Sequence, residues 1–145
     1  MSIIRGIKTL PLRMEQHQKN AFAIAKWLQK QPRVQYVLYP GLENHPGYEI
    51  NKAQTTGFGG MISFAVDNAE TARQILEGVK LIKFAESLGG TESLITYPIR
   101  QTHTDLTAEE CAEKGITDCL LRFSTGIEAT QDLIDDLAQA FAAVK

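Results

Sequence analysis

The sequence predicts one α+β domain, residues 1–145, in which helices cover one face of a small, largely antiparallel sheet. First, a length of 145 residues is typical of a single domain with a core of ordinary size. Second, segments with helical periodicity alternate with short segments rich in β-branched and aromatic residues. Third, the connections between the middle strands are short or helical, which favours this sheet with helices on one face.

The composition is that of a globular protein and argues against several functional classes. Hydrophobic residues make up 43% of the chain and charged residues 22%, which excludes disordered and fibrous proteins. The formal net charge of −2 argues against nucleic acid as a main partner, because phosphate binding needs a clustered basic surface. No apolar run approaches the ~20 residues of a membrane helix, so we expect no membrane partner.

The N-terminus and the cysteines favour a cytoplasmic protein. No apolar segment follows the first basic residues, so we expect no signal peptide. Cys111 and Cys119 have neither metal-ligand spacing nor CxxC spacing, so we expect two free thiols in a reducing compartment. Residues 3–10 have no capping signal before them and resemble the middle of a longer segment.

Residues 1–31 are predicted to be mostly helical. Pro11 begins or kinks a helix because it lacks an N–H, and Pro32 ends the segment because the residue before a proline avoids the α conformation. The apolar face of this helix has the three- and four-residue spacing of one helical stripe. It consists of Met14, Ala21, Ala25 and Leu28, and it is widened by Phe22, Ile24 and Trp27.

Five short segments have the composition of β-strands. They are residues 34–39, 61–66, 81–85, 94–97 and 120–124. We expect short helices at 47–54 and 69–77, a polar loop at 100–105, a helix ending near Lys114, and a final helix with apolar positions from Leu133 to Val144. The predicted caps are Asp67 or Asn68, Thr107 with Glu110 as a capping box, and Thr130, and the predicted stops are Gly78 and Gly115.

A glycine turn at residues 84–93 is expected to gather polar side chains at one edge of the sheet. A predicted strand leads into it, and Gly89-Gly90 permits positive φ or the close approach of another backbone or a ligand. The polar atoms of Glu86, Ser87 and Ser93 are therefore expected to lie together.

Arg122 is the most informative single residue. Alternation along the strand 120–124 places Leu121 and Phe123 on one face and Arg122 on the other. A guanidinium among apolar residues needs an anion, and its planar fork binds a carboxylate through two parallel hydrogen bonds. Two interpretations remain open, a substrate carboxylate or phosphate and a structural salt bridge. The candidate partners for the salt bridge are Glu86, Glu92 and Glu128.

Other motifs do not indicate a site. Residues 57–60 (GFGG) precede a strand, whereas phosphate-binding loops precede helices, so we expect a turn or a bulge there. His17, His45 and His103 lack ligand spacing, so we expect no metal site. No Ser/His/Asp arrangement indicates nucleophilic catalysis, and Glu109-Glu110 is expected on a solvated helix face.

Several ordered motifs that span nearly the whole chain resemble those of one enzyme family. They are RGIKTLPLRM (5–14), YPGL (39–42) with HP (45–46), GFGGM (57–61), FAESLGGTESL (84–94), TH (102–103), GITD (115–118), LRFSTGIE (121–128), DLI (132–134) and DL (136–137). Together they resemble the C-terminal domain of the pyridoxal-phosphate-dependent Cys/Met metabolism (trans-sulfuration) family. That family includes cystathionine γ-synthase, cystathionine γ- and β-lyases and methionine γ-lyase.

The resemblance implies the fold of the small C-terminal domain of a fold-type-I pyridoxal phosphate enzyme, and it assigns roles to single residues. Arg122 matches the arginine that grips the α-carboxylate of the substrate. Ser87 and Leu88 match the segment that lines the carboxylate pocket, and Thr102 matches a residue that shapes it. Glu86 matches a position that helps to select the substrate, and a Glu there is similar to the γ-synthase and γ-lyase branch.

The resemblance also implies what this chain lacks. In the family a larger N-terminal domain holds pyridoxal phosphate and supplies the Schiff-base lysine, and no block of that domain matches here. Because pyridoxal catalysis requires that lysine, we expect the chain to bind no cofactor and to be inactive alone. The expected partners are a sulfur amino-acid substrate, the cofactor-binding domain of the same enzyme and further copies in a homo-oligomer. The alternative is a stand-alone module that binds an amino acid or a partner without catalysis.

Overall fold

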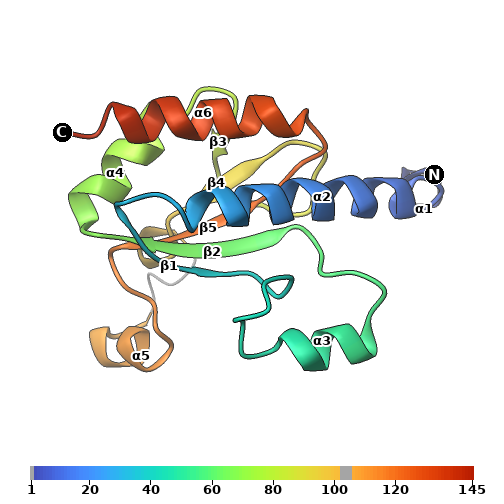
Figure 1. Ribbon diagram of the computed structural model, residues 1–145, viewed down its shortest axis with the longest axis horizontal. Coiled ribbons are helices and arrows are strands. Elements are labelled where there is room, and N and C mark those ends of the chain that lie inside the picture. The colour runs from blue at the N-terminus through green and yellow to red at the C-terminus, as the bar shows by residue number, and fades with distance from the viewer. Residues whose placement is uncertain (1, 102–105) are drawn as a thin grey trace.

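A five-stranded mixed sheet in the order β1-β2-β5-β4-β3 organises the chain (Figure 1). The computed structural model describes residues 2–101 and 106–145. The strands are β1 (Val34–Leu38), β2 (Met61–Val66), β3 (Lys83–Phe84), β4 (Leu94–Thr96) and β5 (Leu120–Ser124). The β1–β2, β2–β5 and β5–β4 pairs are antiparallel, as predicted for most of the sheet, but β3 and β4 are parallel. They are parallel because the segment between them crosses to the end of β5 and forms no hairpin.

Three of the helices cover one face of this sheet. The helices are α1 (Ser2–Ile7), α2 (Leu10–Leu28), α3 (Tyr48–Gln54), α4 (Ala69–Gly78), α5 (Ala108–Glu113) and α6 (Thr130–Ala142), with a 3₁₀ turn η1 at Pro98–Arg100. In Figure 1, α2, α4 and α6 lie above the sheet, whereas α3 and α5 lie on its other side. The α+β class is therefore confirmed, and the placement of every helix on one face is wrong for α3 and α5. Within the described residues, no helix is both long and apolar enough to cross a membrane.

The N-terminal segment forms two helices, because residues 8–9 make a turn between α1 and α2. Pro11 lies in the first turn of α2, where a missing N–H leaves no hydrogen bond unmade. Four members of the predicted apolar face are fully buried, and Trp27 is partly buried. The fully buried members are Ala21, Ile24, Ala25 and Leu28.

The predicted apolar face of α2 is wrong at Met14 and Phe22, which are 42% and 44% exposed. His17 and Asn20 occupy the buried stripe instead. Both side chains hydrogen-bond to backbone carbonyl groups of residues 125–128, at 2.5–3.0 Å. A polar side chain can lie in a core stripe once it is hydrogen-bonded, so apolar spacing alone misplaces this face.

The strand β3 is shorter than the predicted 81–85, because a side chain accepts hydrogen bonds from the backbone N–H groups just before the strand. Asp136 of α6 accepts hydrogen bonds from the N–H groups of residues 80–82 at 2.9–3.1 Å. Those donors cannot also pair with a neighbouring strand, so the ladder begins only at Lys83.

Two predicted helix-end residues have other functions. The hydroxyl of Thr130, the first residue of α6, donates to Asn20 Oδ1 at 2.6 Å, and the N-cap position belongs to Ala129, whose side chain makes no capping bond. Gly78 is the last residue of α4 and not the residue beyond it. A Cβ at Gly78 would lie 3.2 Å from Ala140 Cα, so this glycine permits close packing of α4 on α6.

The other predicted caps are confirmed. Asn68 rather than Asp67 caps α4, because Asn68 Oδ1 accepts the N–H of Thr71 at 2.8 Å. Asp67 forms an ion pair with Arg33 at 3.1 Å. The predicted capping box of α5 has both of its reciprocal hydrogen bonds.

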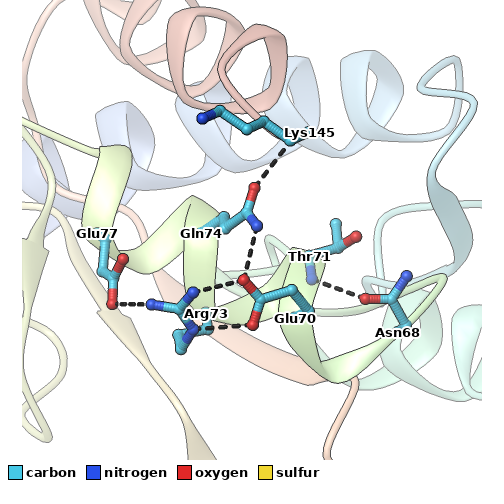
Figure 2. A network of polar contacts seen from close by, with 7 residues as sticks. All are labelled: Asn68, Glu70, Thr71, Arg73, Gln74, Glu77 and Lys145. Atoms are coloured by element: carbon cyan, nitrogen blue, oxygen red, sulfur yellow. Dashed lines mark hydrogen bonds and ion pairs between the residues drawn. The ribbon is translucent and has the colours of Figure 1, made fainter.

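An exposed polar network holds the end of the chain to α4 (Figure 2). Arg73 pairs with Glu70 and, at 2.5 Å, with Glu77, on the adjacent turns of the helix. Gln74 donates to Glu70 at 2.6 Å and accepts the backbone N–H of Lys145 at 3.0 Å. The hydrogen bonds from Arg73 and then Gln74 lower the pKa of Glu70 to about 2.

Candidate carboxylate-binding site

The middle of β5 places Arg122 on the sheet face opposite to α2, α4 and α6. Its neighbours Leu121 and Phe123 are fully buried in the core beneath those helices, as alternation predicts. The strand register sets Ser63 of β2 on one side of Arg122 and Thr96 of β4 on the other. Arg122 therefore lies between two hydroxyl-bearing residues on the second face of the sheet.

Neutral oxygen atoms hold Arg122 in place. Its Nη2 donates to the backbone carbonyl of Glu86 at 2.8 Å and to Thr96 Oγ1 at 3.3 Å. The buried Nε has no partner among the described residues. Within the same residues Arg122 forms no ion pair, so a salt bridge to Glu86, Glu92 or Glu128 is not observed. The positive charge of Arg122 therefore lacks an internal counter-ion in the described part of the chain.

Two contacts with β5 hold the start and the middle of the glycine turn. The carbonyl of Glu86 accepts from the guanidinium described above, and the N–H of Gly89 donates to Ser124 Oγ at 3.0 Å. Gly89 has φ of +73°, a conformation that glycine adopts without strain. Ser87 and Leu88 lie between these contacts and are exposed, Leu88 by 54%. The turn thus presents Ser87 and Leu88 as an open wall beside Arg122.

The end of the turn is held by Glu128, which the sequence suggested only as a salt-bridge partner of Arg122, and by Gly126, to which the sequence gave no role. The carboxylate of Glu128 accepts from the N–H and the hydroxyl of Ser93, at 2.6 and 2.9 Å. A Cβ on Gly126 would lie 2.6 Å from the carbonyl carbon of Glu92, so only glycine allows these backbones to approach. A glycine two residues beyond a predicted strand was the signal available for Gly126.

Of the remaining candidates, Thr102 and His103 lie outside the described residues. His45 Nδ1 accepts the N–H of Gly47 at 3.0 Å within a turn. Across residues 2–101 and 106–145, no group of three or more side chains could hold a metal ion. In the GFGG segment, Gly59 has φ of +70°, two residues before β2 begins at Met61.

The two cysteines are free, and neither is built as a nucleophile. Cys111 is buried, and Cys119 is half-buried beside Asp118. Burial, followed by the hydrogen bond to Asp118, raises the pKa of the Cys119 thiol. A raised pKa keeps the thiol protonated and poorly reactive.

Surface clefts occur elsewhere on the molecule. One of about 400 Å³ lies between the start of α2 and residues 55–59, and one of about 470 Å³ lies along β1. A third, of about 380 Å³, lies between the ends of α2 and α6. None of the three is lined by Arg122 or by the glycine turn.

Curated relatives match nearly all of this chain. Cystathionine gamma-lyase of Dictyostelium discoideum is 53% identical over 138 residues, which cover 94% of this chain and 36% of that protein. Cystathionine gamma-synthase of Haemophilus influenzae is 51% identical over 142 residues, which cover 98% of this chain and 34% of that protein. The chain therefore spans only about a third of the length of these relatives.

Solved structures agree with these matches. Cystathionine gamma synthase from Xanthomonas oryzae pv. oryzae, in complex with aminoacrylate and cysteine, superposes with a TM-score of 0.91 at 45% identity, over 95% of this chain and 36% of that one. Cystathionine gamma-lyase from Lactobacillus plantarum, complexed with L-serine, gives a TM-score of 0.92 at 41% identity, over 97% and 37% of the two chains. The family model of the Cys/Met metabolism PLP-dependent enzymes matches residues 1–142. The chain therefore belongs to the Cys/Met metabolism family of pyridoxal-phosphate-dependent enzymes.

Proposed function

We propose that this chain is the C-terminal part of a pyridoxal-phosphate-dependent trans-sulfuration enzyme of the cystathionine γ-synthase/γ-lyase type. In that enzyme it binds the α-carboxylate of the sulfur amino-acid substrate. The observation that carries the proposal is Arg122, a guanidinium on the second face of the sheet with no carboxylate partner among the described residues. A partly desolvated guanidinium of this kind binds an anion, and its fork matches a carboxylate.

The glycine turn supplies the other contacts in this proposal. Ser87 and Leu88 make no hydrogen bond within the described residues, so their amides and the Ser87 hydroxyl can donate to the carboxylate oxygens. The exposed side chain of Glu86 adds a negative charge beside them and selects among substrates. Thr102, the remaining candidate for this site, lies outside the described residues. Arg122 contributes the charge, and the turn contributes orientation.

The residues of this chain do not fit pyridoxal phosphate. The cofactor is an electron sink whose chemistry depends on a Schiff-base lysine in an enclosed site. All nine lysines of the chain have exposed side chains. We therefore assign the cofactor to a part of the enzyme outside this chain, and the chain alone to substrate binding without catalysis.

An exposed apolar surface supports the proposal that this chain packs against a partner. Ile3, Ile4 and Ile7 of α1 are 76%, 69% and 59% exposed, and Leu12 of α2 is 68% exposed. In Figure 1 these helices extend beyond the edge of the sheet. Exposed apolar side chains that cluster on a surface mark contact sites, so in this proposal they pack on the cofactor-bearing domain or on another copy in a homo-oligomer.

A stand-alone amino-acid-binding module is the second candidate. One observation favours this candidate: Arg122, Ser87 and Leu88 all belong to this chain. Contacts within the chain also position Arg122 and the two ends of the Ser87–Leu88 segment. Titrating the chain with L-cystathionine, L-methionine and pyridoxal phosphate separates the two functions. Tight amino-acid binding without cofactor supports the module, whereas binding that needs the cofactor-bearing domain supports the enzyme part.

The role of Arg122 is tested by Arg122→Leu, with Arg73→Leu on the far side of the sheet as the control. L-Methionine is compared with L-methioninamide, which lacks the α-carboxylate, by NMR titration of the chain and by activity after assembly with a cofactor-bearing domain. We expect Arg122→Leu to weaken methionine binding by about 1.5–3 kcal/mol, or about 10- to 150-fold, and to spare the amide. Unchanged methionine affinity and turnover would overturn the assignment.

A further inference from the structure

A carboxylate outside the binding wall holds the point where the glycine turn rejoins β4. Glu128 Oε1 accepts the backbone N–H of Ser93 at 2.6 Å, and its Oε2 accepts the Ser93 hydroxyl at 2.9 Å. Ser93 is fully buried, and its Oγ also accepts the N–H of Gly126 at 2.8 Å. The three residues therefore form a closed set of hydrogen bonds between the turn and the segment that follows β5.

The backbone of Glu128 is fixed independently of its side chain. Asn20 of α2, fully buried, donates through Nδ2 to the carbonyl groups of Gly126 and Glu128, at 3.0 and 2.9 Å. The hydroxyl of Thr130 orients Asn20 through its Oδ1, at 2.6 Å. A substitution at Glu128 therefore removes the carboxylate contact and leaves the surrounding backbone held.

Charged groups make two of the contacts that hold the turn, namely the contact of Arg122 with the Glu86 carbonyl and the contact of Glu128 with Ser93. The neutral contacts include the bonds from Gly89 to Ser124, from Thr96 to the Ala85 carbonyl, and from the Ile127 N–H to the Thr91 carbonyl. Charge-assisted hydrogen bonds are about twice as strong as neutral ones, and Glu128 makes two of them to a single buried residue. The loss of Glu128 should therefore loosen the turn more than the loss of any one of these neutral contacts.

We infer that Glu128 is a positioning residue for the carboxylate-binding wall. It acts through Ser93 to keep the Ser87–Leu88 segment in register with Arg122. The inference rests on the proposed function for the meaning of that wall, and it assigns Glu128 no contact with substrate.

The first test needs no ligand. In Glu128→Ala, we expect amide hydrogen exchange at Gly89 to accelerate by about tenfold or more, although Gly89 binds Ser124 and not Glu128. Exchange in the core strand β2 should stay unchanged. Glu128→Gln keeps an acceptor for the Ser93 N–H and can donate to Ser93 Oγ, so it should restore most of the protection. Glu92→Gln, an exposed acid of the same turn, is the matched control.

Two exchange results would overturn the inference. One is unchanged exchange at Gly89 in Glu128→Ala. The other is equal acceleration in the turn and in β2, which would give Glu128 a general role in stability. If Glu128→Ala does not fold, Ser93→Ala replaces it, because it removes the hydroxyl contact and keeps the backbone one.

The second test uses the preference of the chain for L-methionine over L-methioninamide. A merely structural residue would change both affinities together, whereas a positioning residue should lower the preference by about threefold or more in Glu128→Ala and not in Glu128→Gln. An unchanged preference would overturn the positioning role. If the wild-type chain shows no preference between the two ligands, the proposed carboxylate binding is wrong. The exchange rate at Gly89 then still shows whether Glu128 holds the turn.

Discussion

The carboxylate of Asp136 in α6 accepts the backbone N–H of Ile82 at 2.9 Å, across 54 residues of sequence. The same carboxylate also accepts from Lys80 and Leu81, so three consecutive N–H groups converge on one side chain. Asp136 is only 7% exposed. This contact connects α4 and β3 to the last helix and directs the chain toward the glycine turn.

Asp136→Ala is expected to lower the free energy of unfolding by about 2–4 kcal/mol, because three backbone donors, the one at Ile82 buried, lose their acceptor. Urea denaturation followed by circular dichroism measures the change. Asp135→Ala is the matched control, since Asp135 is exposed on the same helix, and it should change stability by about 0.5 kcal/mol or less. Similar losses in both variants would mean that the Asp136 contact adds little.

Gly126→Ala is expected to destabilise the fold by about 1–3 kcal/mol, because a Cβ there meets backbone atoms of Thr91 and Glu92 that cannot move aside cheaply. The matched control is Gly6→Ala in α1, where a Cβ would meet nothing within 4 Å. That change should be neutral or slightly stabilising, since alanine favours a helix by up to about 1 kcal/mol over glycine. Thermal unfolding of both variants tests the contrast, and a neutral Gly126→Ala would contradict the close backbone approach.

The elements that the sequence predicts well are those decided by neighbouring residues. The strand β2 and the capping box of α5 depend on composition and spacing within a few residues, and both lie where they were expected. The strand β5 follows the same rule, and its alternation correctly places Leu121 and Phe123 in the core.

The features that the sequence does not predict depend on partners far along the chain. His17 and Asn20 are polar, so the sequence does not predict that they are buried. Their burial depends on backbone carbonyl groups that lie more than 100 residues away along the chain. The shortening of β3 needs Asp136, and the parallel β3–β4 pair needs the crossing of the turn to Ser124. For the candidate site, the position of Arg122 on the second face follows from alternation, whereas its neutral partners are visible only in three dimensions.

The α4 network should make stability depend on pH in the acid range. The pKa of Glu70 falls from 4.5 to about 2 on folding, mainly through the hydrogen bonds from Arg73 and then Gln74. Because the pKa of Glu70 is lower in the folded state, its carboxylate contacts contribute fully to stability above about pH 4.5, and this contribution is lost as the pH falls toward 2. The difference in unfolding free energy between wild type and Arg73→Ala should therefore shrink over that interval.

Salt provides the control for this pH effect, because the network is exposed and exposed ion pairs are screened. Urea titrations at low salt and at about 1 M salt, where the screening length is about 3 Å, should show the difference only at low salt. A difference that is the same at every pH would instead reflect the helix propensity of alanine at position 73.

The exposed apolar surface of α1 should make the isolated chain self-associate. Ile3, Ile4 and Ile7 expose most of their side-chain surface, and burying each isoleucine contributes about 1.5–3 kcal/mol. Sedimentation equilibrium should therefore give a mass above that of the monomer, rising with concentration. Ile4→Lys should shift the chain toward monomer, because a charge would be buried in the contact. Ile50→Lys on α3, at a site 63% exposed, is the matched control and should leave the association unchanged. A monomeric wild-type chain at high concentration would mean that this surface needs a different partner.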